Sequence, residues 1–116
     1  RKRPSRMDSE SRPAPRYPFI AEAEVTEIIS GTKLGARTSD VSTSGCYLDT
    51  LNPSLKGSEI QIRIFHASGT FTALGRVVFV VPNMGMGVVF TTVEDTQLAI
   101  LQEWLSELID NESNAK

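Results

Sequence analysis

Apolar and polar residues alternate along most of this chain with a period of two. The pattern begins in residues 17–29, where Phe19, Ala21, Ala23 and Val25 interleave with mostly polar positions. Similar segments follow between clusters of turn residues, at residues 33–42, 46–51, 59–65, 71–81 and 84–91. A period of two places alternate side chains on opposite faces of a β-strand. The pattern therefore predicts six short strands.

The hydrophobic period changes near residue 91. Beyond it, large apolar residues recur at helical spacing: Leu98, Leu101, Trp104, Leu105, Leu108 and Ile109. This spacing predicts an amphipathic helix that ends at Asp110, and Thr91 and Glu94 have the spacing of a capping box at its start. Strands followed by a helix indicate an all-β domain: a six-stranded antiparallel β-barrel with a C-terminal α-helix. We expect the apolar stripe of the helix to cover the barrel rather than to form a dimer face.

The polar ends of the chain divide it into three parts. Residues 1–16 contain three prolines and no apolar periodicity, which predicts a flexible basic leader. Residues 17–110 hold the barrel and the helix, and a chain of 116 residues is long enough for one hydrophobic core. Residues 111–116 are polar and are expected to form a disordered tail.

Charge is distributed unevenly between these parts. Residues 1–16 contain 6 basic and 2 acidic residues, whereas the rest of the chain contains 6 basic and 12 acidic residues. A basic leader on an acidic body predicts an anionic ligand that the leader holds. The acidic body argues against coating of nucleic acid, so we expect no nucleic-acid partner.

Few residues could support catalysis or metal binding. Cys46 and His66 are the only cysteine and histidine, so we expect neither an internal disulfide nor a metal site. The chain has no plausible catalytic triad and no phosphate-binding glycine loop, so we expect no enzyme activity and no cofactor. We interpret Cys46 as a small buried residue, His66 as exposed or capping, and Trp104 as part of the core. The apolar runs are too short to predict membrane insertion, and the sparse use of cysteine is consistent with a cytoplasmic location.

Two short motifs stand out. Arg12-x-x-x-Arg16 lies where the leader meets the first strand, and Asp40-x-Ser42-x-x-Gly45 lies where the second strand reaches its turn. Combined in this order with a β-rich body and a terminal helix, the motifs resemble the PilZ family. The resemblance extends from residue 12 to about residue 109 and includes the stretches 45–48, 74–78 and 85–90. It implies a PilZ-like barrel that binds the bacterial second messenger cyclic di-GMP through the following residues: Arg12, Arg16, Asp40, Ser42 and Gly45.

The residue types in the two motifs also suit this ligand chemically. An arginine fork can bind phosphate oxygens or guanine O6 and N7, and it can stack on a purine. The carboxylate of Asp40 can accept hydrogen bonds from guanine N1–H and N2–H together. Asp40 and Ser42 are two residues apart on a predicted strand, so we expect them on one face, with the Ser42 hydroxyl free for the ligand. Gly45 is expected to let the turn backbone approach the ligand closely.

Other assignments complete the sequence picture. We interpret a set of further basic residues as surface charges or as a repeat without function: Lys2, Arg6, Arg37, Arg63 and Arg76. A degenerate PilZ-like interaction module without nucleotide binding is the main alternative, and a barrel that binds single-stranded nucleic acid is a second one. We expect the leader arginines to lack a partner until the ligand arrives and then to fold over it. That movement would signal to a protein partner or an attached output domain.

Overall fold

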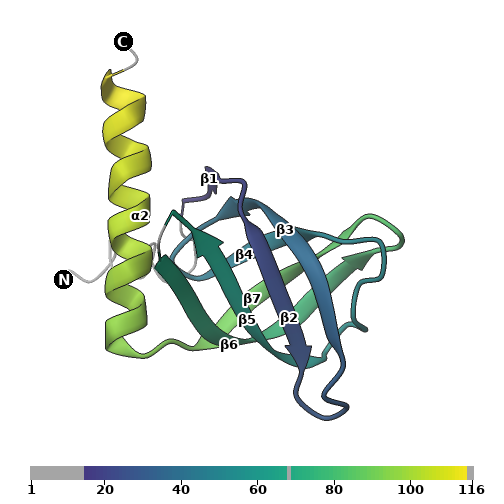
Figure 1. The fold of residues 1–116 in the computed structure, drawn as a ribbon. Helices are drawn as coiled ribbons and strands as arrows, with labels where there is room; N and C mark the ends of the chain where they lie inside the picture. The colour runs from purple at the N-terminus through teal and green to yellow at the C-terminus, as the bar shows by residue number, and fades with distance from the viewer. Residues whose placement is uncertain (1–14, 68, 115–116) are drawn as a thin grey trace, which may run out of the picture.

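A computed structural model describes residues 15–67 and 69–114, with side chains up to residue 110 (Figure 1). In this part of the chain, seven strands precede one long helix. The strands are β1 (Tyr17–Pro18), β2 (Glu22–Glu27), β3 (Lys33–Val41), β4 (Gly45–Asp49), β5 (Glu59–His66), β6 (Gly69–Val81) and β7 (Gly85–Thr92), and the helix is α2 (Asp95–Asn114).

Six of the strands form a closed antiparallel barrel. Their order is β3, β2, β5, β6, β7 and β4, and pairing of β4 with β3 closes the sheet. β1 is an additional short strand that pairs with β3. The helix stands beside the barrel, as Figure 1 shows. The predicted fold, a six-stranded barrel with a C-terminal helix, is therefore confirmed.

The first predicted strand is divided into β1 and β2. The residues between these two strands bind to Thr38 of β3. The Thr38 hydroxyl accepts a hydrogen bond from the Ala21 N–H at 2.9 Å and donates one to the Phe19 carbonyl. Thr38 is fully buried, and these bonds satisfy its hydroxyl group. β1 then lies against the end of β3, where Pro18 is opposite Asp40. The interruption brings the end of the leader beside the second motif.

The inward side chains of the barrel strands form one apolar core. β5 shows the alternation most clearly, because Ile60, Ile62 and Ile64 are fully buried between more exposed neighbours. Burial of one such side chain contributes about 1.5–3 kcal/mol, so these layers supply much of the folding free energy. Cys46 also lies in this core with no exposed surface, which confirms its interpretation as a small buried residue.

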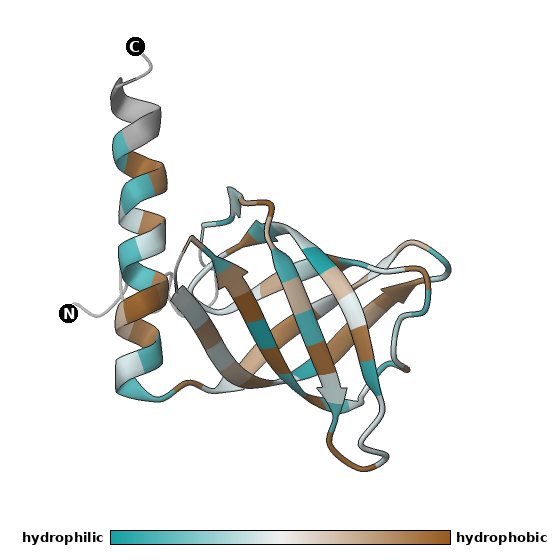
Figure 2. Cartoon of the chain, in the orientation of Figure 1, coloured by the Kyte–Doolittle hydropathy of each residue, from teal (hydrophilic) through white to brown (hydrophobic). Residues whose placement is uncertain are grey.

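The helix packs on the barrel through an aromatic cluster. Leu101, Trp104 and Leu105 are buried, which confirms the centre of the predicted packing face. Ile109 at its end is 43% exposed, so the prediction that it packs on the barrel is wrong. The Trp104 ring stacks on Phe19 with centroids 5.6 Å apart, and its edge contacts His66 at 5.2 Å. His66 is therefore half-buried between aromatic rings, and its interpretation as an exposed or capping residue is wrong. Figure 2 shows brown apolar bands on the helix among polar ones.

The limits of the helix differ from those expected. Strand pairing continues to Thr92, which lies opposite Leu74, so Thr91 belongs to β7 and cannot cap the helix. The Glu94 carbonyl accepts the Leu98 N–H at 2.8 Å, which places Glu94 at the N-cap rather than inside the first turn. The helical backbone also continues past residue 110 to Asn114. Among the described residues, no helix has the length and apolar character needed to cross a bilayer.

Candidate functional site

A bulge in β3 sets the position of Asp40. The register between β3 and β4 shifts between Thr38 and Asp40, and both Thr38 and Val41 point into the core. Strict alternation would place residues 38 and 41 on opposite faces of the strand. The extra residue of the bulge reverses the alternation, so that both side chains face the core. Asp40 consequently lies on the outer surface, opposite Pro18 on one side and Tyr47 on the other.

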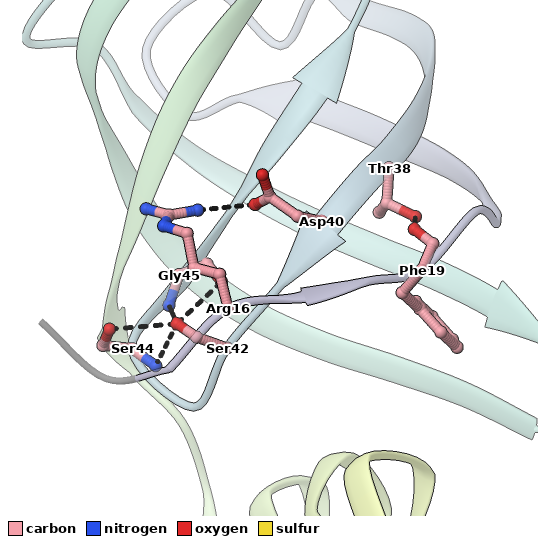
Figure 3. Close-up of polar contacts among 7 residues, drawn as sticks. All are labelled: Arg16, Phe19, Thr38, Asp40, Ser42, Ser44 and Gly45. Carbon is pink, nitrogen blue, oxygen red and sulfur yellow. Dashed lines mark hydrogen bonds and ion pairs between the residues drawn. The ribbon is translucent and has the colours of Figure 1, made fainter. Parts of the chain in front are cut away.

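Ser42 lies beyond the end of β3 and shapes the turn that follows (Figure 3). Its hydroxyl oxygen accepts the N–H groups of Ser44 at 3.1 Å and Gly45 at 3.2 Å. The side chain is almost completely buried, so its hydroxyl is not open to a ligand in this conformation. The expectation that Asp40 and Ser42 share one strand face is therefore wrong, because β3 ends at Val41 after the bulge.

Gly45 is required by the packing of β4 on β7. A Cβ atom at this position would overlap the backbone carbonyl of Val88, which belongs to β7. The absence of a side chain therefore allows two strands to approach each other, which is a different reason from the expected approach of a ligand. Ser42 and Gly45 together determine the shape of the turn, and Thr43 and Ser44 are exposed at its tip.

Arg16 joins the two motifs directly. Its guanidinium Nη1 donates to Asp40 Oδ1 at 2.6 Å, and the side chains are 43% and 34% exposed (Figure 3). The expectation that Arg16 lacks a partner without ligand is wrong, because β1 begins directly after Arg16 and pairs with the end of β3, where Pro18 lies opposite Asp40. Arg12, with the basic residues at positions 2 and 6, lies outside the described residues.

Two aromatic rings extend the outer surface beyond Asp40. Tyr47 is the cross-strand neighbour of Asp40, and Gly87 on β7 lies between Tyr47 and Phe79 in the same row. The two rings are 5.9 Å apart with an interplanar angle of 26°. A Cβ atom at Gly87 would overlap the Phe79 ring, so the glycine lets this ring lie flat on the sheet. The sequence analysis missed this pair because only strand register aligns Phe79 with Asp40.

An open cavity of about 450 Å³ lies on the other side of the turn. Pro15 and Tyr17, which flank Arg16, line it together with Thr43. The opposite wall comes from α2 and includes Leu105 and Ile109. The residues on either side of Arg16 and the tip of the turn therefore face α2 across this cavity.

The other arginines of the barrel and Cys46 do not form a second site of this kind. Arg63 pairs with Glu24 at 3.2 Å and Arg76 pairs with Glu59 at 3.1 Å, which confirms both arginines as strand-surface charges. Arg37 is exposed on β3. The pKa of the Cys46 thiol is raised to about 12, chiefly by burial and also by the charge of Asp40, while Arg16 acts in the opposite direction. The thiol is therefore neutral and unreactive at neutral pH. Within the described residues, no group of three or more potential metal ligands comes together.

The fold is thus a small closed barrel with a terminal helix, and an arginine and an aspartate are paired at its surface. The family model of the PilZ domain matches residues 10–107 of the chain. The match covers most of the barrel and the helix, so the chain belongs to the PilZ domain family.

Solved structures share this fold at low sequence identity. The PilZ domain of YcgR from Escherichia coli, solved with c-di-GMP, is similar with a TM-score of 0.73 and 16% identity, over 90% of this chain and 96% of that chain. The PilZ domain of CeSA from a cellulose-synthesising bacterium gives a TM-score of 0.65 at 16% identity, over 85% of this chain and 99% of that chain.

A longer protein contains the same fold. The Bacillus subtilis inhibitor of motility, MotI/DgrA, is similar with a TM-score of 0.69 and 13% identity, over 91% of this chain. The chain spans about half the length of that protein, with 53% coverage. A comparison with curated proteins found no match.

Proposed function

We propose that this domain is a cytoplasmic receptor for cyclic di-GMP and that it transmits the binding event without catalysing a reaction. The main observation behind the proposal is the Arg16–Asp40 pair on the outer surface of the barrel, beside the half-buried ring of Tyr47 and the exposed ring of Phe79. Membership of the PilZ family supports the proposal, as does the c-di-GMP present in the similar YcgR structure.

Each part of the ligand has a suitable counterpart in the chain. The Asp40 carboxylate can accept the N1–H and N2–H donors of a guanine, which an adenine does not present in the same arrangement. Arg16 and Arg12 offer planar forks for the phosphates or for guanine O6 and N7. Ser42 and Gly45 contribute to the site by fixing the turn that follows Asp40.

Tyr47 and Phe79 add a stacking surface to the proposed site. A guanine held by Asp40 would lie beside Tyr47, because the two residues are cross-strand neighbours. Stacking of a base on an aromatic side chain is worth about 1–3 kcal/mol and depends little on the base. We therefore assign affinity to the aromatic rings and base selectivity to Asp40.

Ligand binding would exchange the partner of Arg16. A pair as exposed as Arg16 and Asp40 is worth about 0–1 kcal/mol, whereas removal of one partner from a desolvated, charge-assisted contact costs about 2–5 kcal/mol. The guanine and phosphates can therefore replace the ion pair at little cost. Movement of Arg16 would shift Pro15 and Tyr17 at the cavity wall, which faces α2. An attached domain or a protein partner would respond to that change.

The alternative is a PilZ-like interaction module that has lost nucleotide binding. The chain retains every residue of both motifs, Arg12, Arg16, Asp40, Ser42 and Gly45, which favours the receptor. A module of this kind would have no need for a guanine-specific carboxylate beside a flat aromatic surface.

Calorimetric titration with cyclic di-GMP and cyclic di-AMP tests the proposal. We expect binding of the first ligand, weakened about 30-fold or more in Arg16→Ala, since one charge-assisted contact is lost. Asp40→Asn should reduce the preference for guanine, because its amide presents donors to the donor edge of the base.

Two control variants, one for Arg16→Ala and one for Asp40→Asn, belong to the same titration. Arg63→Ala removes another ion-paired surface arginine, and Asp49→Asn neutralises another exposed carboxylate on the outer face. Both should leave the affinity within about twofold of the wild type, because neither residue contacts the proposed ligand. Equal affinity of the unaltered protein for both dinucleotides would contradict the role of Asp40, and no binding at all would favour the alternative module.

A further inference from the structure

Three exposed aliphatic side chains gather on two adjoining loops at one end of the barrel. Ile28 is 52% exposed, Ile29 is 96% exposed and Leu55 is 81% exposed. We name these three residues the apolar tip. The first two belong to the β2–β3 turn and the third to the β4–β5 loop. Figure 2 shows the β2–β3 turn as a brown projection at the bottom of the view.

Hydrogen bonds join the two loops. The Ser54 hydroxyl donates to Glu27 Oε2 at 2.7 Å, and the Ile28 N–H donates to the Glu59 carbonyl at 2.9 Å. Ser54 is buried at this junction. The three aliphatic side chains are therefore held on one continuous piece of structure rather than scattered over the surface.

The β2–β3 turn is itself well braced. The Glu27 N–H donates to the Thr32 carbonyl and the Gly31 N–H to the Glu27 carbonyl, both at 2.8 Å. The Ser30 hydroxyl donates to Glu27 Oε1 at 2.8 Å, and Gly31 adopts a φ of 74°, which suits a residue without a Cβ. The polar groups thus fix a turn whose apolar side chains remain in water. Three exposed aliphatic side chains on one fixed projection indicate a contact surface.

Positive charges outnumber negative ones around the apolar tip. Lys33 and Lys56 are exposed next to the two loops, and they are the only lysines among the described residues. Of the nearby acids, Glu59 pairs with Arg76 at 3.1 Å. Glu27 accepts bonds from two serines, which lower its pKa, so it keeps its negative charge. The two lysines therefore outnumber the one nearby carboxylate that lacks a basic partner among the described residues. This small positive excess contrasts with the barrel and helix as a whole, where acidic residues outnumber basic ones.

We propose that the apolar tip, with Lys33 and Lys56, docks the domain on an anionic phospholipid surface. Aliphatic side chains on a projecting turn can enter the boundary between headgroups and acyl chains, while lysines beside them contact lipid phosphates. Charge complementarity favours this occupant over an apolar protein groove, which would not require a pair of flanking lysines. The contact is peripheral and independent of the proposed nucleotide site.

Sedimentation with lipid vesicles tests the proposal on the full chain without nucleotide. The vesicles contain either phosphatidylcholine alone or a mixture of phosphatidylglycerol and phosphatidylcholine, at millimolar lipid because such contacts are weak. We expect preferential binding to the anionic vesicles. Ile29→Asp should lower the partition coefficient at least about tenfold, since a large aliphatic group no longer enters the membrane. Lys33→Gln should lower it about fivefold.

Two matched variants separate the apolar tip from general effects. Ile20→Asp changes another exposed isoleucine, 73% exposed and located between β1 and β2, and should leave the partition coefficient within about twofold. Arg37→Gln removes a positive charge elsewhere on β3 and should also have a small effect. The proposal is overturned if the unaltered chain does not sediment with anionic vesicles. It is equally overturned if Ile29→Asp and Ile20→Asp bind alike, because the lipid would then be held elsewhere.

Discussion

Ser42 and Gly45 illustrate how a motif residue can serve a site through the backbone. The Ser42 hydroxyl accepts two turn N–H groups, and Gly45 clears space for the Val88 carbonyl. Asp40 and Arg16, by contrast, present partly exposed charged groups at the surface. The two motifs therefore combine residues that could contact a ligand with residues that fix where those contacts are made.

Replacement of Gly45 should destabilise the fold rather than weaken ligand binding alone. In Gly45→Ala, the new Cβ would overlap the backbone of β7, and overpacking of this kind costs about 1–3 kcal/mol. Gly35→Ala is a matched control on β3, because no atom lies within 4 Å of the position of its new Cβ. Urea denaturation should show a lower free energy of unfolding for the first variant only. Equal stabilities would mean that β4 can move away from β7 without cost.

Phe79 should affect ligand affinity without affecting base selectivity. The ring is 46% exposed and lies beside Tyr47, so Phe79→Ala removes part of the proposed stacking surface. We expect cyclic di-GMP to bind with about 1–3 kcal/mol less free energy in calorimetry. Val81→Ala, which shortens a 36% exposed side chain two residues along β6, should change the affinity little. An unchanged affinity in Phe79→Ala would remove the aromatic rings from the site.

At the scale of elements, the strands could be predicted where alternation is uninterrupted. β5 is a clear case, since Ile60, Ile62 and Ile64 mark its buried face in the sequence and in the structure. The bulge in β3 could not be predicted, because one extra residue leaves no compositional signal. For the same reason the face of Ser42 was misjudged.

Long-range contacts explain the other differences from the sequence analysis. Partners of Gly45 and neighbours of His66 come from elements far away in the chain, so spacing along the sequence does not reveal them. The motif residues Arg16 and Asp40 could be selected from sequence, but their direct contact depends on pairing of β1 with β3. The expected capping box does not form, because Thr91 is part of strand β7 and is not available to cap the helix.

The attachment of α2 depends on a small number of large side chains. Trp104 stacks on Phe19 and contacts His66, so Trp104→Ala should lower the free energy of unfolding by about 3–5 kcal/mol. Gln102→Ala changes an exposed position on the same helix and should have little effect. Urea denaturation followed by circular dichroism would measure both variants. A loss below about 1 kcal/mol for Trp104→Ala would show that the barrel is stable without the packed helix.

At the scale of the whole molecule, the buried thiol links stability to alkaline pH. The pKa of Cys46 is raised to about 12 in the folded protein, above the ordinary value of 9.0, chiefly by burial. Below the ordinary value both states hold the proton, so stability is fully present there. As the pH rises from 9.0 towards about 12, the unfolded state loses its proton first and the folded state becomes less stable.

Denaturation at pH 8 and at pH 10.5 would measure this effect. The loss of stability between these conditions should be larger in the unaltered protein than in Cys46→Ala, which lacks the titrating thiol. All other ionisable groups are common to the two proteins, so the comparison isolates the contribution of the thiol. The same loss in both proteins would mean that the thiol is accessible to water in the folded state.

Closure of the barrel also limits how this domain can associate with other copies of itself. Each of its six strands has a paired strand on both sides, so no barrel strand forms an open edge along its whole length. Among the described strands, β1 pairs on one side only, but it has two residues, and Pro18 lacks an N–H. Growth of amyloid-like assemblies requires a free strand edge as a template. The folded domain should therefore resist such growth at high concentration, and any aggregation should begin from molecules in which the barrel has opened.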